Sequence, residues 1–248
     1  MIRRLVWGAC AWFALAAPLA HADWLQTGEG CRVFMIKPPK KAEASWTGPC
    51  AGGTANGKGV FRMTTEREDG KHTSTITGKM QDGRFVGTVR IDPGNGDLLE
   101  GALEDGRMRA AKITFADGRA YTGPIVNGLP NGKGKMNYPD GMRYEGDMRN
   151  GVRQGQGIAV YENGARYAGA WRFDLRHGKG DYTTPKGMVI SGTFKNDELR
   201  GRARFTGPDG AWFEGPTKKQ NPHGKGMCGG PERKAAVPCE FRKGKFRR

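Results

Sequence analysis

Several short motifs in this sequence match fragments of known phosphate-binding and catalytic patterns. Residues 52–58 have the spacing G-x-x-x-x-G-K, with which a phosphate-binding loop begins. The next residue of such a loop is Ser or Thr, whose hydroxyl binds magnesium, whereas this chain has Gly59. Lysine also recurs at the place of Lys58 in later parts of the chain. This lysine therefore belongs to a repeated pattern, and we expect no nucleotide site.

Histidine, serine and carboxylate residues give no stronger indication of catalysis. His177 and His223 each precede a G-x-G motif, where the polarity of a solvent-facing turn explains them without a metal or acid–base role. No serine lies in a G-x-S-x-G setting. Glu145 and Asp147 are flanked by Arg143 and Arg149, which is typical of exposed charge pairs on a strand. The sequence predicts no catalytic residue, no cofactor and no metal site, and a protein that is not an enzyme.

The first residues have the pattern of an export signal. A basic start is followed by an apolar run from Leu5 to Ala17, and small residues precede Asp23. This pattern predicts a secretory signal peptide over residues 1–22 and a periplasmic or secreted protein. A twin-arginine signal lacks its flanking pattern here, and lipoprotein processing fits poorly because most of the apolar run follows Cys10. An uncleaved anchor would place the rest of the chain in the same compartment.

Four cysteines follow the predicted signal peptide, namely Cys31, Cys50, Cys228 and Cys239. An even number of cysteines in an exported chain indicates two disulfides. Four cysteines allow three pairings. Because two lie near each end of the chain, a rod-like body would pair Cys31 with Cys50 and Cys228 with Cys239. No C-x-x-C motif is present, which disfavours a metal site.

A three-residue motif of the form Y-x-G recurs along the chain. The number of residues from one copy to the next is nearly constant and equals the number from Tyr144 to Tyr167. Most copies are followed five residues after their Gly by Gly or Asp, and most then have a G-x-G pair and a closing Gly. The motif begins at Tyr121, Tyr144, Tyr167, Ile190 and Phe213, upstream at Leu99 and Ile76, and in a degenerate copy at Trp46. Regular self-similarity at such a period indicates a repeat architecture.

The repeat divides into two strands. Each unit holds two tight-turn dipeptides, such as Asp140-Gly141 and Asn150-Gly151, in which Gly accepts a positive φ. Two turns per repeat predict strands of about 6 to 8 residues in a continuous antiparallel meander. Tyr144 and Met148 share one parity and Glu145 the other. We expect an all-β fold, an elongated single-layer β-meander of stacked hairpins, curved so that its apolar, glycine-containing face packs on itself.

The pattern from Tyr144 to Gly157 resembles the MORN (membrane occupation and recognition nexus) repeat, and the resemblance covers about residues 46–226. It implies stacked β-hairpins in an elongated, twisted sheet that is usually non-catalytic. Such arrays serve protein interaction, self-association or, as proposed for some members, contact with acidic phospholipid. Asp174 and Asp197 depart from the family pattern because they replace Gly, and Ala203 replaces the second Gly of a G-x-G pair.

These boundaries predict the domain organisation. We expect an N-terminal cap segment at residues 23–45, about seven or eight repeats over 46–226 with degenerate first copies, and a C-terminal cap with a basic tail at 227–248.

Positive charge is the functional signal that stands out beyond the repeat. The chain has 41 Lys and Arg against 25 Asp and Glu. A basic residue recurs in the G-x-G loops at Lys58, Lys133, Lys179, Arg202 and Lys225. Since neighbouring repeats lie two strand spacings, about 9.5 Å, apart, we predict a cationic row along one side. The tail adds Arg242, Lys243, Lys245, Arg247 and Arg248.

Two functional hypotheses follow from the repeat and the charge. The first is a non-catalytic scaffold in the cell envelope that binds an unidentified protein partner or a second copy of itself. The alternative is peripheral binding to an anionic membrane or envelope surface, such as acidic phospholipid or lipopolysaccharide, through the cationic row and the tail. Nucleic acid is not an expected partner, since the sequence shows no recognition helix or aromatic base platform.

Overall fold

The computed structural model describes residues 22–36, 38–39, 41–104, 106–232, 235–242 and 244–247. The predicted signal peptide, except for Ala22, lies outside the described residues, as do Lys243 and Arg248 of the predicted tail. Every helix-or-strand element of the described part is a β-strand, and consecutive strands form an open, mostly antiparallel meander. The predicted all-β class is confirmed. The chain forms two compact units, Met1–Asn131 (unit 1) and Gly132–Arg248 (unit 2).

Unit 1 begins with a small sheet of four short strands. Its strands are β1 (Ala22–Gln26), β2 (Arg32–Ile36), β5 (Thr54–Ala55) and β4 (Cys50–Ala51), in that spatial order. β2 and β5 run parallel to each other. The Trp24 and Phe34 rings meet edge to face with their centroids 5.5 Å apart. The segment predicted as an N-terminal cap thus contains strands of its own.

The rest of unit 1 is a chain of antiparallel strands. They are β3 (Glu43–Trp46), β6 (Gly57–Arg67), β7 (Gly70–Gln81), β8 (Arg84–Asp92), β9 (Leu98–Glu104), β10 (Arg107–Met108), β11 (Ala110–Thr114), β12 (Ala120–Val126) and β13 (Leu129–Pro130). β6 and β7 have 11 and 12 residues, more than the predicted length, because they pair without a register shift from Gly57–Met80 to Arg67–Gly70. Trp46, Ile76 and Leu99 are buried at the position of the repeat's tyrosine.

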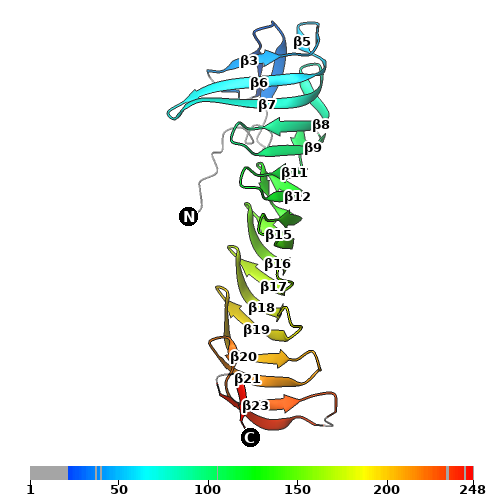
Figure 1. Cartoon of the computed structure of the whole chain (residues 1–248). Helices are drawn as coiled ribbons and strands as arrows, with labels where there is room; N and C mark the ends of the chain where they lie inside the picture. The colour runs from blue at the N-terminus through cyan, green and yellow to red at the C-terminus, as the bar shows by residue number, and fades with distance from the viewer. Residues whose placement is uncertain are drawn as a thin grey trace. The chain divides into compact units, whose positions relative to one another are not determined.

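Unit 2 continues the repeat with hairpins of nearly constant length, which follow one another in chain order (Figure 1). Its strands are β14 (Gly132–Asn137), β15 (Arg143–Arg149), β16 (Val152–Val160), β17 (Arg166–Arg172), β18 (Leu175–Thr183), β19 (Val189–Lys195), β20 (Glu198–Thr206), β21 (Trp212–Lys218), β22 (Asn221–Pro222), β23 (Gly224–Gly229), β24 (Val237–Arg242) and β25 (Lys245–Arg247). The strands from β15 to β21 alternate between seven and nine residues.

The two turns of each repeat differ in backbone conformation. At the turn between β15 and β16, both Asn150 and Gly151 have positive φ, as a type I′ hairpin requires. At the opposite edge only Gly141 has positive φ, while the Asp140 carboxylate accepts a hydrogen bond from the Met142 N–H at 3.0 Å. The two edges of the unit 2 sheet therefore present different turn types and different side chains.

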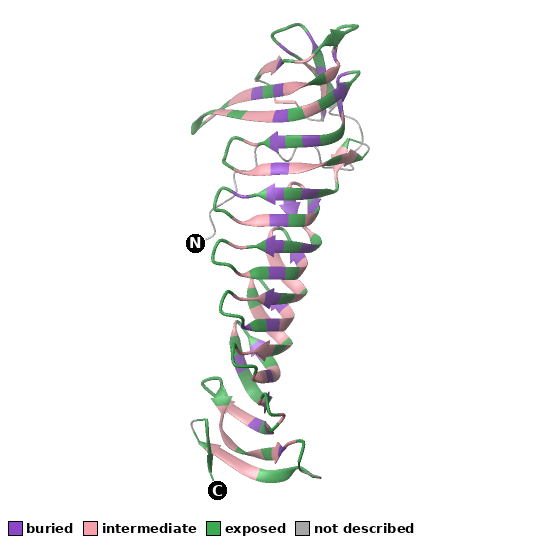
Figure 2. Ribbon diagram, turned by 45° about the vertical axis from the view of Figure 1, so that its right-hand side comes forward, coloured by how far each residue is buried: buried purple, intermediate pink, exposed green. Residues whose placement is uncertain are grey.

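The faces of the unit 2 sheet follow the predicted alternation. Tyr144 and Met148 are buried on one face and Glu145 is exposed on the other, and buried and exposed positions alternate along the strands (Figure 2). The tyrosine rings lie over glycines, because a methyl group added to Gly157 or Gly180 would overlap the Tyr144 or Tyr167 ring, respectively. The glycines thus let each ring lie close against the backbone, as the sequence predicted.

The basic C-terminal segment is a packed hairpin. β24 pairs with β23 on one side and with β25 on the other. The Phe241 ring lies 4.6 Å from that of Phe213 and 5.6 Å from that of Phe246, measured between centroids. Phe241 thus packs the hairpin against Phe213 of the sheet, and Phe246 packs on Phe241 within the hairpin. Arg242, Lys245 and Arg247 are exposed on it.

The structure brings the cysteines together in the predicted pairs. The Cα atoms of Cys31 and Cys50 are 5.7 Å apart and those of Cys228 and Cys239 are 5.9 Å apart, which is disulfide range. We expect a non-reducing digest of the purified protein to yield these two linked peptide pairs by mass spectrometry. A peptide linking Cys31 or Cys50 to either C-terminal cysteine would contradict this pairing.

Candidate interaction surfaces

The aromatic face of unit 2 is held by a ladder of rings. The Trp171 ring meets the Tyr144 ring at 5.5 Å and the Tyr167 ring at 5.1 Å, and Tyr167 meets Phe194 at 5.2 Å, all edge to face. Each tyrosine hydroxyl donates to a carbonyl three residues ahead, Tyr144 to Asp147 at 2.8 Å and Tyr167 to Ala170 at 3.0 Å. Edge-to-face contacts add stabilisation beyond that from burying apolar surface. The rings therefore stabilise this face in one arrangement.

Burial of these rings predicts an alkaline stability limit. Desolvation raises the pKa of Tyr121 and of Tyr167 from 10.0 to about 12, and it raises that of Tyr144 as well. In the unfolded chain the tyrosine hydroxyls lose their protons near pH 10. The stabilisation that the folded protein gains from burying the neutral phenols is therefore complete below pH 10 and is lost as the pH rises through 12. A spectrophotometric titration at 295 nm should show these tyrosines ionising late. Ionisation of all six tyrosines of the chain near pH 10 would contradict this burial.

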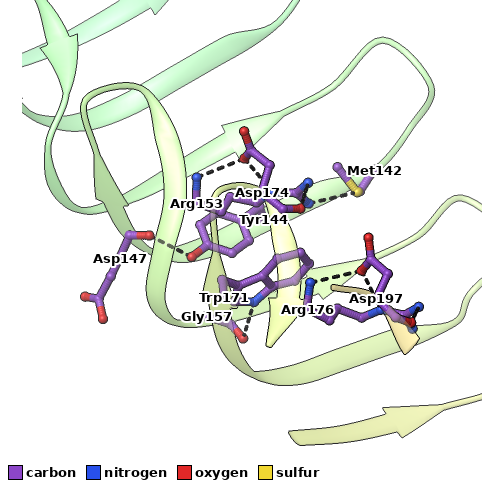
Figure 3. Close-up of polar contacts among 9 residues, drawn as sticks. All are labelled: Met142, Tyr144, Asp147, Arg153, Gly157, Trp171, Asp174, Arg176 and Asp197. Carbon is purple, nitrogen blue, oxygen red and sulfur yellow. Dashed lines mark hydrogen bonds and ion pairs between the residues drawn. The ribbon is translucent and has the colours of Figure 1, made fainter. Parts of the chain in front are cut away.

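An arginine on one hairpin holds the turn of the next hairpin. Arg153 on β16 donates from Nε to the Asp174 carboxylate at 3.0 Å and from a terminal guanidinium nitrogen to the Asp174 carbonyl at 2.8 Å (Figure 3). Its backbone N–H donates to the same carboxylate at 2.9 Å. The guanidinium lies 4.3 Å from the centroid of the Trp171 ring, a cation–π distance. Its side chain is only 13% exposed.

The same arrangement recurs one repeat later. Arg176 donates to the Asp197 carboxylate at 2.9 Å and to the Asp197 carbonyl at 2.8 Å, and its guanidinium lies 5.2 Å from the Phe194 ring centroid. Asp174 and Asp197 have φ of 66° and 69°, a region in which glycine is favoured. The hydrogen bonds from the arginines offset the backbone cost of having Asp there. We call these two contacts the inter-hairpin ion pairs.

Sequence reasoning recorded the two aspartates as departures and missed the arginines. A signal was present, because each Asp that replaces Gly follows an Arg at the same distance, Asp174 after Arg153 and Asp197 after Arg176. Read as a pair, the two changes indicate a compensating contact between neighbouring hairpins. Read singly, each aspartate is only a defect in the repeat.

The residues of the inter-hairpin ion pairs line an open groove of about 440 Å³ on the aromatic face of unit 2. The groove is lined by Met142, Arg153, Tyr161, Asn163, Ala165, Trp171, Asp174, Arg176, Tyr182 and Asp197. Two arginines face two aspartates, so its lining is balanced in charge. The Asp174 and Asp197 side chains are 42% and 43% exposed and retain carboxylate oxygens that reach solvent. The groove therefore presents aromatic rings and hydrogen-bonding groups to solvent.

The predicted cationic row lies on the opposite, outer face. Lys179, Arg202 and Lys225 are exposed and occupy equivalent places on β18, β20 and β23. Lys133 is exposed on β14, but Gln156 takes the intervening place on β16. Carboxylates stand opposite the two ends, where Lys133 pairs in register with Asp147 and Lys225 with Glu240. Unit 2 therefore holds a short row of three cations, and Lys58 is exposed in unit 1.

Comparison with protein families identifies the repeat. Four consecutive segments match the family model described as MORN repeat, at residues 121–143, 144–166, 167–189 and 191–212. These four segments of the chain are MORN repeats. MORN repeats are generally a non-enzymatic module, found in proteins that often mediate protein or membrane interactions. No curated protein sequence matches this chain.

The matched MORN repeats include both inter-hairpin ion pairs and the groove. The two aspartates that depart from the MORN pattern lie in the third and fourth matched segments. Outside those segments, the row residue Lys225 and the C-terminal hairpin belong to the same unit 2 sheet. The groove therefore lies within the matched MORN repeats, and the two aspartates that line it are departures from the MORN pattern.

The remaining candidates for chemistry stay isolated. His177 lies within β18 and is half-buried, not in a turn as predicted, because β18 begins two residues earlier at Leu175. His223 directly precedes β23, and its backbone N–H donates to Pro216. The described residues hold no cluster of three or more His, Cys, Asp or Glu placed to bind a metal ion. Within the same residues, no helix has the length and apolar character needed to cross a membrane.

Proposed function

We propose that this protein is an exported, non-catalytic MORN scaffold that mediates protein–protein interaction or self-association in the cell envelope. The groove on the aromatic face carries this proposal. Its arginines and aromatic rings belong to the residue types that supply most of the binding energy at protein interfaces. Arg153 and Arg176 are already fixed by Asp174 and Asp197. Binding of a partner would therefore cost little conformational entropy of these two arginine side chains.

Site-specific photocrosslinking tests the groove directly. The photoreactive residue p-benzoylphenylalanine would replace Tyr161, a half-buried aromatic that lines the groove. A matched control places it at Ile158, which is exposed on the outer face of the same hairpin. We expect a defined adduct from position 161 in intact cells, at twice the monomer mass for self-association. Equal adducts from both positions, or none from either, would contradict a groove-bound partner.

Export is supported by the sequence pattern of residues 1–22 and by the two cysteine pairs at disulfide distance, since structural disulfides persist in oxidising compartments. We expect the protein recovered from the producing cell to begin at Asp23 and to be found in the envelope or the medium. N-terminal sequencing of that protein is the measurement. Unprocessed protein in the cytoplasm would contradict export.

A second candidate function is binding to an anionic envelope surface, and the row of Lys179, Arg202 and Lys225 favours it. Because the C-terminal hairpin is packed against Phe213, truncation would disturb the fold, and charge substitution is the cleaner test. The protein should sediment with anionic vesicles and not with neutral ones, and salt should reverse the binding. Equal sedimentation with both kinds of vesicle would contradict an electrostatic contact.

A further inference from the structure

One edge of the unit 2 sheet carries a cation at the same place in every hairpin. Arg149, Arg172, Lys195 and Lys218 each end the first strand of a hairpin, recur once in each repeat, and are all exposed. Adjacent members lie about 9.5 Å apart, which is two strand spacings. Sequence reasoning placed the cations of interest in the G-x-G loops and missed this set.

These cations keep their charge available. Asp174 and Asp197, in the turns that follow Arg172 and Lys195, are engaged by Arg153 and Arg176, and the Asp147 carboxylate accepts a hydrogen bond from the Gln156 N–H. Glu198, the carboxylate opposite Lys195, is paired with Arg200. None of the four edge cations takes part in an ion pair among the described residues. The edge is therefore a line of four exposed cations that no described ion pair engages.

A phenylalanine protrudes in the middle of this line. Phe173 follows Arg172 in the turn between β17 and β18 and is 64% exposed. Its φ is 49°, a conformation that is unfavourable for a bulky residue. The equivalent turn positions hold Asn150, Asn196 and Lys219, so the repeat itself does not require an aromatic there.

The inter-hairpin ion pairs fix this turn in place. Asp174, the residue after Phe173, is bound by Arg153 through its carboxylate and its carbonyl, and its own N–H donates to the Arg153 carbonyl at 3.1 Å. The Phe173 backbone is thus anchored to the preceding hairpin, while the Arg172 guanidinium lies 5.7 Å from the Phe173 ring centroid. The aromatic is presented outward from a rigid support.

We infer that this edge, which we call the basic hairpin edge (Arg149, Arg172, Phe173, Lys195 and Lys218), docks on an anionic lipid bilayer. A cation repeated at equal intervals matches a ligand whose negative charge is also repeated laterally. The exposed phenylalanine between the cations fits a ligand that has an apolar phase behind its charge. A lipid layer offers both, whereas a soluble polyanion offers only the charge. This inference rests on the second proposed function and assigns the contact to the hairpin edge in place of the outer-face row.

The test compares two variants that remove the same charge from the full-length mature protein. The edge variant is Arg149→Gln, Arg172→Gln, Lys195→Gln, and the row variant is Lys179→Gln, Arg202→Gln, Lys225→Gln. Binding is measured by sedimentation with vesicles of phosphatidylglycerol and phosphatidylcholine. At about 1 kcal/mol for each cation near the surface, the edge variant should bind about 100-fold more weakly. The row variant should bind within about threefold of the wild type.

A second substitution separates a bilayer from a soluble polyanion. Phe173→Ser should weaken vesicle binding about tenfold and leave binding to polyphosphate unchanged. Circular dichroism verifies that each variant is folded. Loss of binding in the row variant alone would overturn this inference and leave the second proposed function standing. No binding of the wild type to anionic vesicles would overturn both, and an unchanged Phe173→Ser variant would overturn the bilayer as the ligand.

Discussion

Replacing Tyr167 with alanine should lower the free energy of unfolding by about 4 kcal/mol. The side chain is fully buried, its ring contacts both Trp171 and Phe194, and it fills the space above Gly180. Removing it leaves a cavity in a single-layer sheet that has no second layer to collapse into. Urea denaturation followed by tryptophan fluorescence and circular dichroism is the measurement.

The conservative substitution Tyr167→Phe is the matched control. It keeps the ring and removes only the hydroxyl that donates to the Ala170 carbonyl at 3.0 Å, so it should cost about 1 kcal/mol. If the alanine and phenylalanine variants were equally stable, the ring ladder would not be what holds the aromatic face together.

The second large effect is expected at the inter-hairpin ion pairs. Asp174→Ala should cost about 3 kcal/mol, because it leaves the largely buried Arg153 guanidinium without its carboxylate partner and keeps a side chain at a positive φ. The double substitution Arg153→Met, Asp174→Gly removes the buried charge and restores the glycine of the repeat. We expect this double variant to unfold within about 1 kcal/mol of the wild type.

A double-mutant cycle measures this coupling. The single variants Arg153→Met and Asp174→Gly and the double variant are compared by urea denaturation. Lys135→Ala, Glu145→Ala and their double variant form a control pair. That pair lies 3.5 Å apart with both side chains well exposed, so its coupling should be below about 0.5 kcal/mol. Additive effects of Arg153→Met and Asp174→Gly would show that the two residues do not compensate each other.

The sequence allowed the repeat, its strands and its two faces to be predicted because these depend on local rules. A dipeptide such as Asn150-Gly151 marks a turn wherever it occurs, and the alternation of Tyr144 with Glu145 assigns the faces without knowledge of any partner. The ring-over-glycine contact of Tyr144 with Gly157 follows from the same pattern.

What could not be predicted depends on contacts between separate parts of the chain. Asp174 is explained only by Arg153, which lies in the preceding hairpin. The C-terminal segment was predicted as a basic tail because it has many cations. Its folding into a hairpin depends on the packing of Phe241 against Phe213, which lies in an earlier strand. Phe173 was not singled out, because its exposure follows from the turn geometry that Asp174 and Arg153 stabilise together.

The inter-hairpin ion pairs also bear on how the array comes apart. In a linear repeat protein, stability is the sum of the stability of each repeat and of the interfaces between neighbours. Arg153–Asp174 and Arg176–Asp197 strengthen two successive interfaces and leave the interior of each hairpin unchanged. Fraying from the C-terminal end should therefore slow at β20, and the amide hydrogens of the hairpins from β15 to β20 should exchange together. The two ion pairs thus set the size of the cooperative unit.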